Sequence, residues 1–341
     1  METMLAARYL GPNQIVTETV SIPVIGAGEA LVRVEACGFC GSDINIIAGT
    51  HPRAQAPLTV GHELAGRIVK IHDRSSEFKV GDRVTMYPLI SCGVCYACTH
   101  GFPHVCRKLQ LFGFDVDGGM AEFIKLPVSC LMMLPDGMSP GVGALIEPLA
   151  VAVHGIARTS LVSTEVAVVL GAGPIGLLTG LALKAHQVPH VIISDVFSNR
   201  IELARSLGLE AAAAGPEVFD RVMKITAGNG ADALFECAGH PSSAREMTQL
   251  ARSRAVIVNL GVFKKPVELD MQAVNFKELE IVGSRVYERK DFADAIALAS
   301  QLPLEKIISH AFPIADVSMA FQQFQSSEAC KVLILPSQAS R

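Results

Sequence analysis

The sequence predicts an α/β fold with a doubly wound parallel sheet in the second half of the chain. Three observations support this: apolar, β-rich runs recur there, helix-like stretches separate them, and a glycine-rich turn follows the first run. With 341 residues, the chain is long enough for two domains with cores of their own. The expected strands are VAVVL (166–170), HVIISD (190–195), ADALFECAG (231–239) and AVIVNLGV (255–262).

The glycine-rich turn follows the first of these strands and fits the G-x-G-x-x-G pattern of dinucleotide-binding turns. Gly171 permits the tight turn, Gly173 lets the backbone approach a pyrophosphate, and Gly176 allows close packing of helix on strand. A strand before the pattern and a helix after it are the context that this motif requires. We therefore expect the turn to bind a dinucleotide through Gly171, Gly173, Pro174, Ile175 and Gly176.

The second strand ends in Asp195, nineteen positions after Gly176. An acidic side chain there accepts hydrogen bonds from the ribose hydroxyls and repels a 2′-phosphate, so the sequence favours NAD over NADP. Ser198 is expected to cap a helix that ends at Gly208.

The stretch SCGVCYACTHGFPHVC (91–106) holds four of the nine cysteines. Short spacings let neighbouring thiolates converge on one ion, and four thiolates suit a structural zinc, with an iron–sulfur cluster as the rival interpretation. A disulfide framework is disfavoured, because the cysteine number is odd and nothing indicates an oxidising compartment. A closed site has no vacancy for a substrate, so Cys92, Cys95, Cys98 and Cys106 are expected to stabilise the loop.

A second group of ligand-type residues lies upstream. The β-like run EALVRVEACG leads into Cys40, Ser42 and Asp43, and His62 and Glu63 precede a further strand-like run. A catalytic zinc needs three mixed ligands and an open position, which this cysteine, histidine and carboxylate set can supply.

Composition narrows the function classes further. Only 18% of residues are charged and the net charge is −4, with no basic run that would indicate nucleic-acid binding. The N-terminus lacks the pattern of a secretory signal, so a cytoplasmic location is expected. The uncharged residues 166–183 have the length of a membrane span, but their central glycines predict strand, turn and helix instead.

These motifs together resemble the zinc-dependent medium-chain alcohol dehydrogenases. The similarity spans nearly the whole chain through CGFCGSD, GHELAG, VGDRV, the four-cysteine loop, DGGMAEF, IEPLAVAVH, GAGPIG and GVF. The sorbitol (polyol) and threonine dehydrogenase branch is the most similar, because Glu147 stands where classical alcohol dehydrogenases carry a ligand cysteine. The resemblance implies a Rossmann nucleotide domain (148–288) inserted into a β-rich, chaperonin-10-like catalytic domain (1–147 and 289–341).

The resemblance also implies roles for the upstream residues. Cys40 and His62 would bind catalytic zinc, and either Glu63 or Glu147 would complete the ligand set. Ser42 would contact the substrate hydroxyl. Asp43 would support a zinc ligand, and Cys37 would serve packing alone. Many relatives carry a proton-relay histidine five residues after the zinc cysteine. Here that position is Asn45, and His51 is expected to be a solvated loop residue.

Further cofactor contacts follow from the same resemblance. Arg200 would contact the adenosine ribose, and the GVF loop would lie beside the nicotinamide. Arg285 would face both cofactor and substrate. The additional cofactor-binding residues implied are Leu260, Gly261, Val262 and Ser284.

The sequence therefore predicts a dehydrogenase with two zinc ions per subunit, acting on a polyol or sugar acid. It would oxidise a secondary alcohol to a ketone with NAD+. One alternative is L-threonine 3-dehydrogenase-like oxidation of a 3-hydroxy amino acid. Another, from a different class, is a non-catalytic protein that binds NAD and zinc. By resemblance, the chain is expected to form a homo-oligomer, a dimer or homotetramer, without nucleic-acid or membrane partners.

Overall fold

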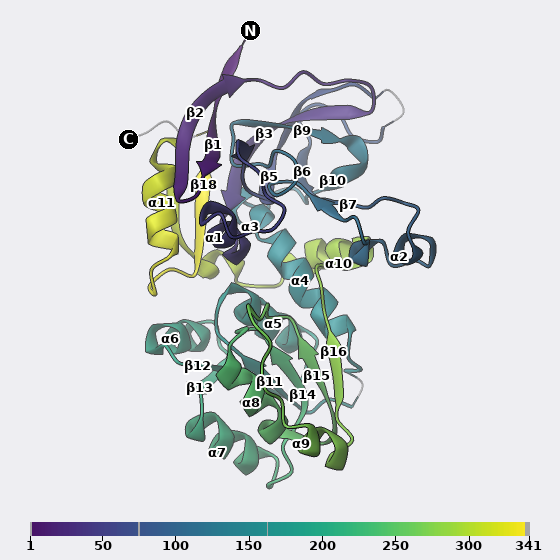
Figure 1. Ribbon diagram of the computed structural model, residues 1–341, viewed down its shortest axis with the longest axis vertical. Coiled ribbons are helices and arrows are strands. Elements are labelled where there is room, and N and C mark those ends of the chain that lie inside the picture. The colour runs from purple at the N-terminus through teal and green to yellow at the C-terminus, as the bar shows by residue number, and fades with distance from the viewer. Residues whose placement is uncertain (1, 74–75, 162, 338–341) are drawn as a thin grey trace. The chain divides into compact units, whose positions relative to one another are not determined.

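The computed structural model describes residues 2–73, 76–161 and 163–337, which form two compact units (Figure 1). The first unit comprises Met1–Glu147 and Leu304–Arg341, and the second comprises Pro148–Pro303. The units divide at 147/148 and at 303/304, so helix α10 (Arg289–Ala299) belongs to the second unit. There Asp291 pairs with His154 of helix α4 (Ile146–Ala157), with 2.7 Å between Oδ2 and Nδ1.

The first unit is β-rich, as expected. A seven-stranded sheet has the order β10-β6-β5-β3-β18-β17 with β9 also paired to β3, and smaller sheets join β2-β1-β4 and β7-β8. Its elements up to residue 144 are β1 (Thr3–Gly11), β2 (Gln14–Ser21), β3 (Glu29–Gly38), α1 (Gly41–Ile47), β4 (Leu58–Thr59), β5 (Glu63–Ile71), β6 (Arg83–Met86), β7 (Leu89–Ile90), α2 (Tyr96–Thr99), η1 (Pro103–Val105), β8 (Gln110–Leu111), β9 (Phe123–Pro127), η2 (Val128–Cys130), β10 (Leu131–Met133) and α3 (Pro140–Ala144). The C-terminal segment adds η3 (Leu304–Ile307), β17 (Ile308–Pro313), η4 (Ile314–Asp316), α11 (Val317–Phe324) and β18 (Lys331–Leu335).

Strand β3 is the centre of this unit. Its alternating small and β-branched residues Ala30, Val32, Val34 and Ala36 are all fully buried, as a strand with one core face requires. Strands β5 and β18 pair with it in antiparallel fashion, and Gly38 at its end stands opposite both Glu63 and Leu333. The end of β3, the start of β5 and the start of β18 therefore meet, although they are far apart in sequence.

The second unit confirms the doubly wound parallel sheet. The strand order is β13-β12-β11-β14-β15-β16, and every neighbouring pair is parallel. The chain winds outward from β11 in one direction and then from β14 in the other, so the order reverses between β11 and β14 (Figure 1). Besides α4 and α10, its elements are β11 (Val166–Leu170), α5 (Pro174–Ala185), β12 (His190–Asp195), α6 (Ser198–Ser206), β13 (Glu210–Ala213), α7 (Pro216–Ile225), β14 (Ala231–Glu236), α8 (Pro241–Leu250), β15 (Ala251–Asn259), α9 (Met271–Phe276) and β16 (Glu280–Gly283).

The apolar stretch 166–183 folds as the strand β11, a turn and most of helix α5, as the glycines predict. Within the residues that the structure describes, none of the helices combines the length and apolar character of a membrane span. Helix α6 begins at Ser198, but Phe197 occupies the capping position that was expected of Ser198. The backbone N–H of Phe197 donates instead to Asp195 Oδ1 at 3.0 Å, so the acidic residue organises this turn.

Candidate active site and metal centres

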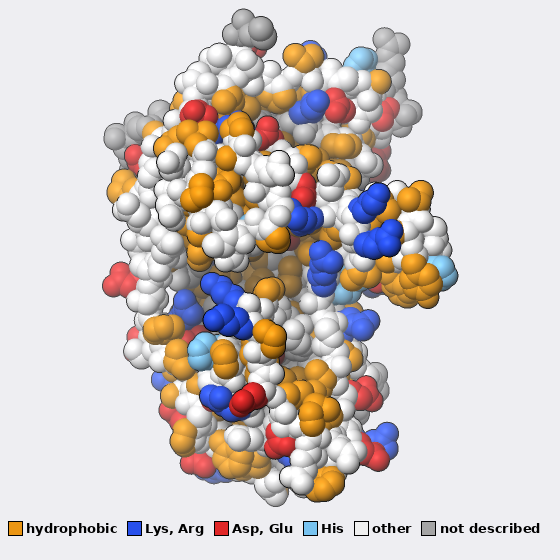
Figure 2. Space-filling view, viewed as in Figure 1, with side chains coloured by type: hydrophobic (Ala, Val, Ile, Leu, Met, Phe, Trp, Pro, Cys, Tyr) orange, Lys and Arg blue, Asp and Glu red, His pale blue; other side chains and the backbone are white. Residues whose placement is uncertain are grey.

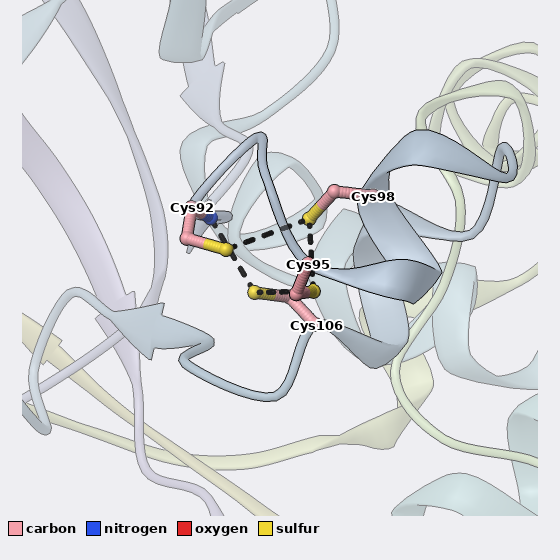
Figure 3. A group of neighbouring side chains, drawn as sticks. All are labelled: Cys92, Cys95, Cys98 and Cys106. Atoms are coloured by element: carbon pink, nitrogen blue, oxygen red, sulfur yellow. Dashed lines mark hydrogen bonds between the residues drawn. The ribbon is translucent and has the colours of Figure 1, made fainter.

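The four clustered cysteines converge on one point (Figure 3). The Sγ–Sγ distances are 4.0 Å for Cys92–Cys98, 3.6 Å for Cys95–Cys98 and 3.7 Å for Cys95–Cys106. Four sulfurs placed about 2.3 Å from a tetrahedral zinc would lie about 3.8 Å apart. All four thiols are free, and their separations are far longer than a disulfide bond. The donor set therefore fits a structural zinc.

Backbone amides prepare these sulfurs for a cation. The N–H groups of Cys92 and Lys108 donate to Cys106 Sγ at 3.4 and 3.3 Å. Backbone hydrogen bonds, first from Cys98, lower the pKa of Cys95 to about 6. The lowered pKa favours the thiolate of Cys95, which is the form of cysteine that binds metal ions.

The loop that holds this cluster also exposes apolar side chains at the surface of the first unit. They show as hydrophobic colour around the α2 segment in Figure 2 and belong to Val94, Tyr96, Phe102 and Val105. A loop this short with apolar groups turned outward has little core to hold it. Zinc bound by the four cysteines would therefore hold this loop in its folded conformation.

The upstream cluster is also assembled. Cys40 caps helix α1, His62 immediately precedes β5, and Glu63 is the first residue of that strand. One potential ligand atom from each of these three residues lies within 4.8 Å of those of the other two. His62 and Glu63 are buried and Cys40 is partly exposed. Three mixed donors, one of them partly exposed, are a ligand set that a catalytic zinc can use.

Charges around His62 make this pocket strongly attractive to a cation. Burial lowers the pKa of His62, but the Cys40 sulfur, Glu147 and Asp43 outweigh burial and raise it to about 10. Glu147 thus acts on the cluster, although it is not one of the three residues that converge. Burial raises the pKa of Asp43 to about 6, against the opposing effect of His62. Asp43 Oδ2 accepts a hydrogen bond from the Cys40 N–H at 2.8 Å and so fixes the turn that presents the sulfur.

A buried lysine contacts the cluster, and sequence reasoning missed it. Lys331 Nζ donates to both carboxylate oxygens of Glu63, at 2.9 and 2.7 Å, and to the Phe39 carbonyl at 2.9 Å. The side chains of Lys331 and Glu63 are only 3% and 2% exposed. Gly38 makes room for this pair, since a Cβ there would lie 2.2 Å from Glu63 Oε2. The available signal was a lysine at the start of the apolar run KVLIL.

The remaining upstream residues lie as follows. Ser42 Oγ is buried, with no hydrogen-bond partner among the described residues. Cys37 is fully buried in β3, and burial raises its pKa. The Asn45 carbonyl accepts from the His51 N–H at 3.0 Å, and His51 Nδ1 accepts from the Ala54 N–H at 3.1 Å. His51 therefore organises its own loop.

The glycine-rich turn has the shape that a pyrophosphate requires. Gly171 has a φ of +103°, a conformation that side chains disfavour, and a Cβ at Gly176 would lie 1.8 Å from the Gly171 carbonyl oxygen. A Cβ at Gly173 would meet nothing within 4 Å, so the backbone faces open space at the start of α5, where Pro174 and Ile175 follow. A helix N-terminus behind an open glycine turn fits a dinucleotide phosphate.

Asp195 stands at the end of the neighbouring strand. Its Oδ2 accepts from the Ala172 N–H of the glycine turn at 2.7 Å. Arg200 Nη1 lies 3.8 Å from the same oxygen, and the Arg200 guanidinium lies 5.0 Å from the centre of the Phe197 ring. Asp195 and Arg200 are thus brought together beside the turn.

The other expected cofactor residues lie at the ends of β15 and β16. Leu260 and Gly261 are half-buried, and Val262 is 84% exposed. Ser284 Oγ is buried without a partner among the described residues, whereas the Arg285 side chain is exposed. The structure thus places all of them at the carboxyl edge of the parallel sheet, where open α/β sheets bind ligands.

Comparison with known proteins finds a matching family in each half of the chain. Residues 26–136 match the alcohol dehydrogenase GroES-like domain, and residues 174–301 match the zinc-binding dehydrogenase family. A 2-dehydro-3-deoxy-L-galactonate 5-dehydrogenase of Pseudoalteromonas atlantica is 34% identical over 97% of this chain and 98% of that protein. The chain belongs to the zinc-dependent medium-chain alcohol dehydrogenases. A sorbitol dehydrogenase of Halalkalibacterium halodurans is also 34% identical, over 92% of this chain and 93% of that protein.

Solved structures of related dehydrogenases agree with this assignment. An alcohol dehydrogenase of Escherichia coli CFT073 complexed with NADH has a TM-score of 0.90 and 32% identity, covering 98% of this chain and 100% of that one. A Sinorhizobium meliloti 1021 protein bound to NADP has a TM-score of 0.92 and 30% identity over the same shares. The family resemblance and the fold class read from the sequence are confirmed, and the family is one that uses zinc and a nicotinamide dinucleotide.

Proposed function

We propose that this dehydrogenase oxidises a secondary alcohol of a polyol or sugar acid to a ketone, with NAD+ as acceptor. The observation that supports the proposal is that the potential ligand atoms of Cys40, His62 and Glu63 lie within 4.8 Å of one another. The substrate class is supported by relatives named as a dehydrogenase of a sugar acid and a sorbitol dehydrogenase.

In this proposal Cys40, His62 and Glu63 bind the catalytic zinc, and Glu147 adds negative charge beside them. Glu63 is preferred because its carboxylate lies within ligand distance of the other two, while Lys331 uses only part of its acceptor capacity. When bound, zinc polarises the alcohol oxygen and NAD+ accepts the hydride. Ser42 would relay the alcohol proton: its hydroxyl oxygen, which has no partner among the described residues, accepts that proton and its own O–H proton passes to a ribose hydroxyl or to ordered water.

The second zinc is assigned to Cys92, Cys95, Cys98 and Cys106, whose sulfur spacing fits a closed structural site. In this proposal Asp195 selects NAD, because an acidic side chain at the end of the second strand would repel a 2′-phosphate. The expected contacts of Arg200, Leu260, Gly261, Val262, Ser284 and Arg285 with the cofactor are part of the same proposal.

Two further expectations also belong to it. We propose a cytoplasmic location, because nine free cysteines and two thiolate-containing sites need a reducing compartment. We also propose a homo-oligomer, a dimer or tetramer, as in the family. Light scattering of the purified protein would test this.

A screen for NAD+ reduction, followed at the NADH absorbance, tests the substrate class. Polyols, aldonates and 3-hydroxy amino acids should be compared at equal concentration. The proposal expects turnover with a polyol or aldonate and little with threonine. Preference for threonine would contradict the substrate class, and absence of turnover with every class would favour a protein that binds NAD without catalysis.

A further inference from the structure

Glu236 is a buried carboxyl group beside the position where the sheet order reverses. It is the last residue of β14, and its side chain is fully buried. The next residue, Cys237, donates its N–H to the Leu170 carbonyl of β11 at 2.9 Å. In a doubly wound sheet, a dinucleotide binds in the crevice at the point where the strand order reverses. Glu236 therefore lies directly beneath the expected cofactor crevice.

The two carboxyl oxygens of Glu236 have different surroundings. Oε1 accepts from the Ala238 N–H at 3.0 Å, the Gly239 N–H at 2.8 Å and the Ser243 hydroxyl at 2.7 Å. Oε2 is buried and has no hydrogen-bond partner among the described residues. An anionic oxygen buried without a hydrogen-bond donor is strongly disfavoured, so the charged form of this carboxyl group is destabilised here.

A second buried acceptor lies on the neighbouring strand. Asn259 ends β15 and is the register partner of Glu236, so both side chains leave the same face of the sheet at adjacent positions. Asn259 Oδ1 is also buried without a partner in the described part of the chain, while its Nδ2 donates to the Gly261 carbonyl at 3.2 Å. Two neighbouring acceptors can both be satisfied if one of them carries a proton.

Burial favours this protonation, since it raises the pKa of Glu236 against the opposing hydrogen bonds and the nearby His240. The titratable neighbours are His240, which is exposed, and Cys237, whose own pKa burial raises strongly. The neutral carboxyl group would have an O–H on Oε2, and the acceptor that we assign to it is Asn259 Oδ1, the unpaired oxygen on its register partner.

Glu236 also joins two backbone loops. Its carbonyl accepts from the N–H groups of Leu260 and Gly261, at 2.9 and 2.8 Å. A Cβ at Gly261 would lie 2.2 Å from Glu236 Oε2 and 2.5 Å from the Gly239 N–H nitrogen. The turn at 237–239 and the loop at 260–262 therefore press against each other over this carboxyl group, with no room for a larger residue.

We propose that Glu236 is a neutral carboxylic acid that, through Asn259, positions the 237–239 and 260–262 loops for the nicotinamide half of the cofactor. Glu236 is a positioning residue, because it acts through the loops. Asp195 and β12 mark the adenosine side of the reversal point, so β14 and β15 flank the other half of the dinucleotide. The inference rests on the proposed use of NAD.

Binding of whole and partial cofactor tests this inference. NADH binding can be followed by its own fluorescence, without a tryptophan background because the chain has none. ADP-ribose, which lacks the nicotinamide, can be followed by calorimetry. Glu236→Ala should weaken NADH binding about tenfold and leave ADP-ribose binding within about twofold. Glu236→Gln should restore NADH binding, because its amide can both accept at one end and donate at the other.

Asn259→Ala provides a second variant, whose NADH binding should weaken in the same selective way even if Glu236→Ala fails to fold. Asp232→Asn is a matched control on the same strand. Asp232 lies at the opposite end of β14, where its Oδ1 is 2.5 Å from Arg252 Nε. The Asp232→Asn variant should therefore leave the ratio of the NADH and ADP-ribose affinities unchanged.

Equal weakening of NADH and ADP-ribose, or no weakening of either, by both Glu236→Ala and Asn259→Ala would overturn the inference. A Glu236→Gln protein that binds NADH as weakly as the alanine variant would overturn the neutral-acid assignment. If the unmodified protein bound neither NADH nor ADP-ribose, the proposed NAD-dependent function would be wrong. That outcome is distinct from a failure of the role proposed for Glu236, which is judged from the variants.

Discussion

The buried pair of Lys331 and Glu63 allows a prediction whose size follows from the structure. Lys331→Met removes three hydrogen bonds, of 2.7, 2.9 and 2.9 Å, and leaves the Glu63 carboxylate buried without its cation. Breaking a buried ion pair from one side costs about 3–5 kcal/mol, because the remaining charge is uncompensated. We expect the free energy of unfolding of the first unit to fall by about this amount.

Urea unfolding followed by far-ultraviolet circular dichroism measures this loss, with a chelator in every sample so that metal binding does not contribute. The double variant Lys331→Met, Glu63→Gln removes both charges and should recover at least half of the loss. Lys125→Met is the matched control. Lys125 lies 3.5 Å from Glu29 with 41% of its side chain exposed, and such surface pairs contribute about 0–1 kcal/mol.

The reasoning would be refuted if Lys331→Met cost no more than Lys125→Met, or if the double variant were as unstable as the single one. Either result would mean that Lys331 does not stabilise the protein by compensating the buried carboxylate of Glu63.

The remaining predictions concern the cofactor, the structural metal, proton transfer and pH. Asp195→Ala should bring the kcat/KM values for NAD+ and NADP+ closer together, and equal use of both by the unmodified enzyme would contradict the role of this carboxylate. Cys95→Ala should release one zinc and lower the melting temperature, so a fully stable variant would exclude a stabilising role for the loop metal. Asn45→Ala should cost little turnover; a loss of about a hundredfold, ~2.7 kcal/mol of barrier, with zinc retained would make Asn45 part of the proton path. Because the pKa of Glu236 is raised on folding, the unmodified protein should lose stability as pH rises from the ordinary glutamate pKa through the raised one, and Glu236→Gln should lack this loss in urea titrations across pH.

Much of the nucleotide-binding unit could be predicted because its signals are local. Strands β11 and β12 begin and end where their apolar runs do, and the glycine spacing specified the turn between β11 and α5. The four-cysteine loop was equally readable, since its ligands lie within sixteen residues. The cap of α6 was misplaced by one residue, because Phe197 is the capping residue and Ser198 is the first residue of the helix.

Features that depend on distant contacts could not be read from the sequence. Lys331 reaches Glu63 across 268 positions, and only the pairing of β3 with both β5 and β18 brings them together. The contact between His154 and Asp291, which ties helix α10 to helix α4, spans 137 positions and was equally invisible in the sequence. Glu236 was visible only as part of an apolar strand.

The zinc content of the purified protein tests the central claim most directly. Elemental analysis by mass spectrometry, normalised to protein concentration, should give two zinc ions per chain for the unmodified enzyme and one for Cys40→Ser. In the variant the four-cysteine site remains intact, and NADH should still bind. One zinc in the unmodified protein, or two in Cys40→Ser, would contradict the assignment of a catalytic zinc to Cys40, His62 and Glu63.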